Sequence, residues 1–348
     1  MTQKRIYTID IARAISIILV VTGHFQPEGS PSWWMSFYDV LHTFRMPLFL
    51  AVSGYTYIYL LNERKDKQRT YKNFVLHKFQ RLMIPYFFIS VFIIGTKLLF
   101  GGNSAAENPV SYASFYEMFY TPAAGPFVWF VYVLFFIFLI IPHFNTRKGL
   151  TILFAISLIL HFIPIAMPLQ LEYLRYFKSM LVFFVAGCLF YEWRSLRTLI
   201  MNTNFFIFVA FFVVFYVMAV MSNANQFISS LWGFMASLFG AIMIVKFAKF
   251  ISEKEKIQQV FLSVAACSYT IYLFHTTSEG FAKAVFGRLH LGQYIGYNLS
   301  FILEAIVVIS FGVIAPLILH HIITRKSKIF SYLIGANYKN NKRTRSDN

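Results

Sequence analysis

Apolar segments follow one another along almost the whole chain, separated by short links that carry most of the charged residues. About ten of them approach the roughly 20 residues that an α-helix needs to cross a bilayer. They cover residues 8–25, 38–61, 82–100, 127–143, 149–166, 178–192, 204–221, 227–248, 260–281 and 294–323. The pattern predicts an all-α fold, a polytopic membrane bundle of about ten transmembrane helices.

The basic residues predict how these helices are oriented. Most of the 31 lysines and arginines lie in alternate links and near the two ends of the chain. Because cytoplasmic loops collect Lys and Arg, this bias predicts an even number of spans with both termini in the cytoplasm. We expect residues 1–337 to form one integral membrane domain and the basic residues 338–348 to form a disordered cytoplasmic tail.

Composition favours a membrane protein over a soluble one. Hydrophobic residues make up 58% of the chain, whereas soluble domains are about 45–50% apolar. The net charge of +17 would suggest a nucleic-acid partner in a soluble protein. Here the charge lies in the links, so we expect contacts with membrane lipids and no nucleic acid. The two cysteines, Cys188 and Cys267, lie within apolar segments, so neither a disulfide framework nor a metal site is predicted.

The first apolar segment contains three ionisable residues, Asp10, Arg13 and His24. It has no small-residue cleavage pattern, so we expect it to be retained as a span rather than removed as a signal peptide. On one helix, Arg13 and His24 would share a stripe and lie about 16 Å apart along the axis. Ionisable groups are costly inside a bilayer and usually mark a functional path. The segment therefore predicts a chemical path across the membrane.

Four segments, in order, resemble the membrane-bound acyltransferase family 3: IDIARAISIILVVTGH, FRMPLFLAVSGY, KFQRLMIPY and CSYTIYLFH. The first is most similar to the branch of fucose O-acetylase-like proteins, and the resemblance runs from about Ile9 to about Leu319. It implies a ten-span bundle in the bacterial inner membrane. Such a bundle takes an acyl group, usually acetyl, from cytoplasmic acyl-CoA. It places that group on a hydroxyl of a carbohydrate, often a surface or secreted polysaccharide.

Two positions depart from the pattern of this family. Many relatives read FHMPLF where this chain has Arg45 in place of the histidine. Either His42, one turn earlier, substitutes for it, or the acceptor site favours an anionic group. At the start of the third span, a pair of arginines common in the family is replaced by Lys78 and Arg81, which keeps the charge but loses one bidentate fork.

Acyl transfer to an alcohol needs a base near the hydroxyl and a donor for the developing oxyanion. His24 is the candidate base, because imidazole titrates near neutrality; alternatively, it only caps the end of its helix. Arg13 is suited to neutralise a phosphate or a pantetheine carbonyl; alternatively, it forms a structural ion pair with Asp10. Asp10 cannot orient His24 as in a triad, because fourteen helical residues separate them by about 21 Å.

The remaining candidate residues divide between donor and acceptor. Lys78 and Arg81 are expected to bind the phosphates of acyl-CoA, the only co-substrate predicted, unless they serve topology alone. Ser53 lines the donor path or allows close helix packing. The acceptor side contains Arg45, His42, His275 and Tyr272.

Two other kinds of protein were considered. An exporter or flippase of a glycan or lipid-linked sugar would call for related halves or broken midplane helices, which the sequence does not display. A membrane sensor or scaffold would not need ionisable residues inside its spans. An O-acetyltransferase acting on a carbohydrate is therefore the leading hypothesis.

Overall fold

The computed structural model describes residues 6–63, 70–100, 109–164, 171–222, 224–290, 294 and 296–338, and all regular elements in these ranges are helical. Each of the ten predicted apolar segments forms helix over most of its length. The all-α prediction is therefore confirmed for the described part of the chain.

The chain divides into two compact units, and every pair of residues discussed below lies within one unit. The first unit consists of residues 1–65 and 183–319. It contains α1 (Tyr7–Thr22), α2 (Ser32–Glu63), the end of α8 (Glu172–Glu192), α9 (Arg194–Asn202), α10 (Phe205–Met221), α11 (Gln226–Ser252), α12 (Glu255–Gly287) and most of α14 (Tyr297–Lys326).

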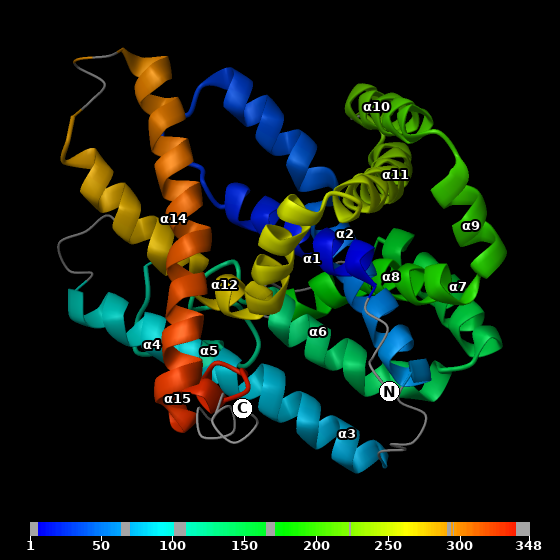
Figure 1. Cartoon of the computed structure of the whole chain (residues 1–348), viewed down its shortest axis with the longest axis horizontal. Helices are drawn as coiled ribbons and strands as arrows, with labels where there is room; N and C mark the ends of the chain where they lie inside the picture. The colour runs from blue at the N-terminus through cyan, green and yellow to red at the C-terminus, as the bar shows by residue number, and fades with distance from the viewer. Residues whose placement is uncertain are drawn as a thin grey trace. The chain divides into compact units, whose positions relative to one another are not determined.

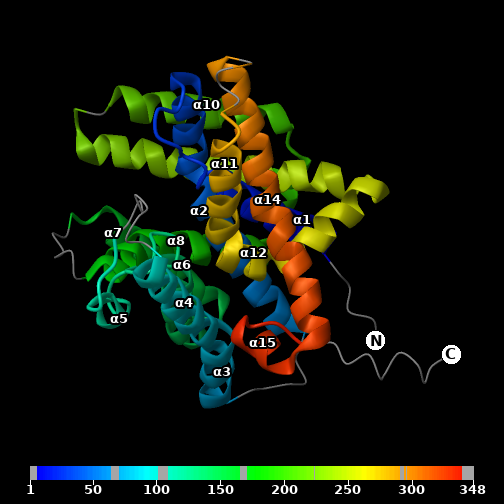
Figure 2. The same ribbon diagram turned by 90° about the vertical axis from the view of Figure 1, so that its left-hand side faces the viewer.

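Helix α1 is the central element of the first unit, where it contacts α2, α11 and α12 (Figures 1 and 2). Nine of its sixteen residues are buried, and they lie on several sides of the helix: Ile9, Ile11, Ala12, Ala14, Ile15, Ser16, Ile17, Val20 and Val21. The small residues among them let neighbouring helices approach closely, as is typical of membrane bundles. Helix α1 is thus fixed by packing.

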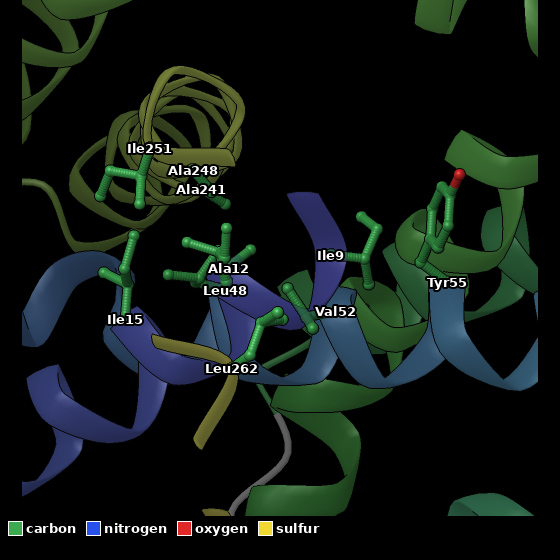
Figure 3. Packing of buried hydrophobic residues seen from close by; sticks show 11 residues of the cluster. Ile9, Ala12, Ile15, Leu48, Val52, Tyr55, Ala241, Ala248, Ile251 and Leu262 are labelled. Atoms are coloured by element: carbon green, nitrogen blue, oxygen red, sulfur yellow. The ribbon is translucent and has the colours of Figure 1, made fainter. Parts of the chain in front are cut away.

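Figure 3 shows the apolar cluster that packs around the first half of α1. Its buried members come from α1, α2, α11 and α12 and are Ile9, Ile11, Ala12, Ile15, Leu48, Val52, Tyr55, Ala241, Ala248, Ile251 and Leu262. A fully buried aliphatic side chain contributes about 1.5–3 kcal/mol relative to an exposed one in water. Within a bilayer the gain is set by packing density rather than by removal from water.

Helices α2 and α8 touch backbone to backbone. A Cβ on Gly54 would overlap the carbonyl oxygen of Phe184, and a Cβ on Gly187 would overlap that of Ala51. The thiol of Cys188 also donates to the carbonyl oxygen of Gly54, with Sγ and O 3.3 Å apart. Only glycine fits at these two positions, so they fix the distance between the helices.

The second unit consists of residues 66–182 and 320–348. Its elements are α3 (Tyr71–Lys78), a π turn (Phe79–Met83), α4 (Ile84–Phe100), α5 (Ser114–Glu117), α6 (Trp129–Ile140), the 3₁₀ turn Ile141–Phe144, α7 (Arg147–Phe162), the start of α8 and α15 (Lys328–Leu333). The π turn ends two residues before Pro85, which has no N–H for the usual helical bond and so favours a wider turn.

Hydroxyl groups hold the second unit together where α4 meets the segment before α6. Tyr86 and Tyr173 share a hydrogen bond of 2.7 Å between their hydroxyl oxygens, and the Tyr173 hydroxyl also donates to the Thr121 carbonyl oxygen at 2.8 Å. The ring of Tyr173 stacks on that of Tyr132, with centroids 4.1 Å apart. These buried tyrosines satisfy their polar ends within the unit.

Five described helices are long and apolar enough to cross a membrane. They are Tyr71–Leu99, Glu172–Glu192, Gln226–Ser252, Glu255–Gly287 and Tyr297–Lys326. Helices α9 and α10 meet at a bend of 95° and would make a sixth span if counted together. The chain is thus an integral membrane protein, whereas the count of ten spans, the cytoplasmic termini and the single domain 1–337 stay predictions. All but the first residue of the predicted tail lies outside the described residues.

A lysine of α11 binds the backbone at the bend between α9 and α10. The ammonium group of Lys246, from α11, donates to the carbonyl oxygens of Ile200, Met201 and Thr203 at 2.9, 3.2 and 2.6 Å. These carbonyls are the ones that a helix leaves without partners at its C-terminal end. A buried cation is thereby satisfied, and the end of α9 is capped.

We expect Gly187→Ala to lower the Tm of the detergent-purified protein, because the added methyl group would overlap the Ala51 carbonyl oxygen. Overpacking of this kind costs about 1–3 kcal/mol. Gly233→Ala on α11 is the matched control, since a Cβ there meets nothing within 4 Å, and it should not lower the Tm. Equal Tm values for the two variants would contradict the close approach of α2 and α8.

Candidate functional site

The first helix ends earlier than the sequence predicted. The predicted helix 8–25 stops at Thr22, and Gly23 and His24 form a turn. The backbone N–H of His24 donates to the Val21 carbonyl oxygen at 2.9 Å, three residues back, which is the tighter 3₁₀ pattern. The helix therefore ends three residues earlier than predicted, and the shared stripe of Arg13 and His24 stays a prediction.

His24 lies beside a second imidazole, that of His275 on α12. Their ring centroids are 4.9 Å apart and the rings are inclined by 58°. His275 is fully buried, and its Nδ1 lies 2.8 Å from the carbonyl oxygen of Tyr272 on the same helix. Because a carbonyl oxygen can only accept, Nδ1 of His275 carries a hydrogen, and the neutral ring has its lone pair on Nε2.

Arg45 of α2 packs against the turn that positions His24. Its side chain lies where a side chain of Gly23 would be, so that a Cβ on Gly23 would overlap the guanidinium. Arg45 is buried, with 7% of its surface exposed. The ring of Tyr38 lies over the guanidinium, with its centroid 5.2 Å from Cζ. Only glycine at position 23 allows this contact, which brings a permanent cation next to the candidate base.

Further basic groups surround His24. Those that act on it electrostatically are His275 and Lys283 from α12 and Arg45 and His42 from α2. His275, Glu279 and Lys283 follow one another at four-residue spacing and so share one face of α12. The structure therefore brings together His24, Arg45, His42 and His275, four of the residues that the sequence selected.

Tyr272 lies near this group as well. It is 2% exposed, and its ring centroid is 5.9 Å from that of His275 and 6.5 Å from that of Phe49 on α2. Its carbonyl oxygen, rather than its hydroxyl, is the group that contacts His275. Tyr272 thus supports the imidazole pair through its backbone, and a contact with substrate stays a prediction.

A separate polar group lies toward the first turns of α1. Arg13 forms an ion pair with Asp10 at 3.3 Å between Nη1 and Oδ1, and its Nη2 donates to the hydroxyl of Thr56 on α2 at 2.8 Å. About a quarter of the Arg13 side chain is exposed. The ion pair that the sequence allowed as an alternative is therefore present.

This group lines a cavity of about 260 Å³ between α1 and α2. The cavity is lined by Ile6, Ile9, Asp10, Arg13, Tyr55, Thr56, Tyr59 and Leu60. Its walls combine one guanidinium and one carboxylate with two phenols and aliphatic side chains, as is typical of sites for small molecules. Near it, Nη1 of Arg197 on α9 donates to the Tyr55 hydroxyl at 3.4 Å.

The other residues predicted to bind acyl-CoA contact groups of the protein itself. The Ser53 hydroxyl donates to the Phe49 carbonyl oxygen of its own helix at 2.8 Å. In the second unit, the Lys78 ammonium lies 3.6 Å from the ring centroid of Phe138. Arg81 donates to the Gly335 carbonyl oxygen and to the Asn337 side chain. Binding of acyl-CoA by these residues stays a prediction.

Several residues of the site were not predicted from the sequence. Thr56 lies one turn beyond Ser53 on α2, and that helical spacing was a usable signal. The four-residue spacing of His275, Glu279 and Lys283 was another. The contact of Gly23 with Arg45 left no signal, because it joins two different helices. Among the described residues, no group of three or more His, Cys, Asp or Glu side chains is arranged to hold a metal ion.

These observations define the class of protein. It is a membrane protein whose described regular elements are helical, with an arginine-lined cavity beside α1 and an imidazole pair formed by the turn after α1 and by α12. A family model described as an acyltransferase domain, of acyltransferase family 3, matches residues 6–321. The chain belongs to this family, and the resemblance seen in its motifs is confirmed.

The comparison with curated proteins adds a more distant relative. The chain is 24% identical over 177 residues to the nodulation protein NolL of Mesorhizobium japonicum. The match covers 48% of this chain and 44% of that protein, so it spans less than half of either. No solved structure matches the chain.

The effects of Thr56→Val and Arg13→Gln on the free energy of unfolding should not be additive. The two side chains share a hydrogen bond, so a double-mutant cycle should give a coupling of about 0.5–1.5 kcal/mol. Thr43→Val is the matched control on α2, because its hydroxyl bonds only the Asp39 carbonyl oxygen of the same helix. A coupling of zero for both threonines would contradict the Arg13 network.

Proposed function

We propose that this acyltransferase is an O-acyltransferase that moves an acyl group, most simply acetyl, from acyl-CoA to a hydroxyl of a carbohydrate. The observation that carries the proposal is the imidazole of His24, backed by His275 and placed beyond the end of a helix whose first turns line an arginine-bearing cavity. A base and an anion-binding cavity on one helix are what a transfer from a thioester to an alcohol requires.

The cavity beside Arg13 is the proposed donor site. The guanidinium of Arg13 suits a phosphate or a polarised carbonyl of acyl-CoA. Tyr55 and Tyr59 offer rings and hydroxyls to the rest of the coenzyme. Lys78 and Arg81 would add charge for its phosphates. The basic links favour a cytoplasmic location for this end of the path.

His24 is the proposed base. Its imidazole takes the proton from the acceptor hydroxyl while the hydroxyl oxygen attacks the thioester carbonyl carbon. A C–O bond forms, the C–S bond breaks, and the proton passes from His24 to the leaving thiolate, which departs as free CoA. The buried ring of His275, whose centroid is 4.9 Å from that of His24, would hold the base in place by packing against it.

The acceptor is proposed to be a surface or secreted polysaccharide, or its lipid-linked precursor, reached from the outer side of the bacterial inner membrane. The family and the proposed orientation of α1 support this. Mass analysis of surface glycans from strains with and without the protein would identify the acyl group from the mass difference. Fragmentation would then locate the acylated hydroxyl.

His24→Ala should abolish transfer of labelled acetyl from acetyl-CoA to a glycan by the purified protein. A general base contributes about 10²–10⁴-fold, so the rate should fall by at least about a hundredfold. Binding of acetyl-CoA and the Tm should change little, because His24 lies in a turn away from the cavity beside Arg13. Full transfer by a folded His24→Ala protein would remove the proposed base. Movement of a glycan into vesicles without acyl-CoA would favour an exporter instead.

His275→Ala should lower kcat on the order of a hundredfold, with little effect on the KM for acetyl-CoA, because the base loses the group that orients it. His275→Gln should retain more activity, since glutamine keeps a polar side chain of similar length that can bond the Tyr272 carbonyl oxygen and pack against His24. His161→Ala is the control, because this histidine of the second unit also contacts a backbone carbonyl, that of Ser179 at 2.8 Å. A parallel rise in KM, or no difference between Ala and Gln, would contradict a positioning role for His275.

A further inference from the structure

Arg45 is a buried cation for which the described part of the protein provides no counter-ion. Its Nη1 atom is buried and has no hydrogen-bond partner among the described residues. The Tyr38 hydroxyl accepts a hydrogen bond from the guanidinium and the backbone of Gly23 packs against it, and neither group carries a negative charge. Burial of an unpaired charge is costly, so such groups are normally paired or neutralised.

The other cations in the interior of the first unit are satisfied by the protein. Lys246, which is 9% exposed, donates to three carbonyl oxygens. Arg13, although less buried, has both a carboxylate and a hydroxyl as partners. Arg45 differs from both, because its guanidinium keeps donor capacity that the described residues do not use. An anion from outside the chain would supply what is missing.

The position of Arg45 says which molecule would bring that anion. Its guanidinium touches Gly23, the residue directly before His24, and it acts electrostatically on the His24 ring. The group that loses its proton to His24 belongs to the acceptor, so an anion at Arg45 would lie a short distance from the reacting hydroxyl. The donor cavity is lined by Arg13 instead.

We propose, on the basis of the proposed function, that Arg45 selects an acceptor carrying an anionic group close to the acylated hydroxyl. Two sources of that anion share the same chemistry: the carboxylate of an acidic sugar and the phosphate of a lipid-linked precursor. A guanidinium binds either one through two parallel hydrogen bonds. Gly23 is part of the site, because a side chain there would displace the guanidinium.

The test compares acceptors that differ only in charge. Membranes containing the full-length protein are given labelled acetyl-CoA and a panel of oligosaccharides, each offered with its uronic acid intact and after reduction of the carboxylate to an alcohol. A second arm offers each neutral oligosaccharide free and as its polyprenyl diphosphate. The wild-type protein should show a kcat/KM about 10–100-fold higher for the charged member of one arm. The arm with the preference identifies the source of the anion.

Arg45→Gln should abolish this preference by raising the KM for the charged acceptor. The kcat/KM of this variant for the charged acceptor should then fall to about its value for the neutral acceptor. Arg45→Lys should keep part of the preference, because a single charge remains but the bidentate fork is lost. Arg175→Gln is the matched control, since this arginine of the second unit is exposed and pairs with Glu172. It should leave kcat/KM unchanged for both acceptors. Acetyl-CoA binding and Tm report whether the Arg45→Gln protein is folded.

The outcomes separate this proposal from the one on which it rests. Transfer without any charge preference, or an Arg45→Gln variant that loses kcat equally on both acceptors, would overturn the anion site and leave the acyltransferase reaction in place. If Arg45→Gln does not fold, a loss of the preference in Arg45→Lys supports the site, and an unchanged preference in that variant overturns it. Absence of transfer from acetyl-CoA to every acceptor would overturn both proposals.

Discussion

The first unit depends on the burial of one helix, α1, between α2, α11 and α12. Most of its surface is apolar and packed, so its few polar groups can only face the gaps that its neighbours leave. Asp10 and Arg13 face a cavity shared with α2, and the chain after Thr22 turns toward α2 and α12. The packing that stabilises the unit therefore also determines where its reactive groups can lie.

The buried polar groups near the two ends of α1 differ in how they are satisfied. Near the start, Arg13 is satisfied by Asp10 and Thr56 beside an open cavity. Beyond the other end, basic groups gather around His24, and Nη1 of Arg45 has no hydrogen-bond partner among the described residues. The polar groups at one end are thus satisfied without a ligand, whereas those at the other end would be completed by the proposed anion. This difference is what a protein with a donor site and an acceptor site on one helix would need.

Glycine sets two distances that the site depends on. Gly54 and Gly187 let α2 approach α8 to backbone contact, which fixes the position of α2 within the first unit. Gly23 then lets Arg45 of that helix reach the turn that holds His24. A methyl group at any of these positions would move a helix or a guanidinium. The location of the cation beside the candidate base therefore follows from missing side chains as much as from those present.

The sequence by itself determined the helical class and the approximate position of each long apolar helix, and it supplied the candidate residues for the chemistry. The length of an apolar segment and the placement of Lys and Arg are local properties, and in a membrane protein they indicate the helices and the links between them. His24, Arg13, Arg45 and His275 stood out because charge in an apolar segment is costly wherever the segment packs.

Only the tertiary structure decided that α1 stops at Thr22, that His24 meets His275, and that Arg45 occupies the space above Gly23. These contacts join residues far apart in the chain, and they depend on how helices pack, which no local pattern records.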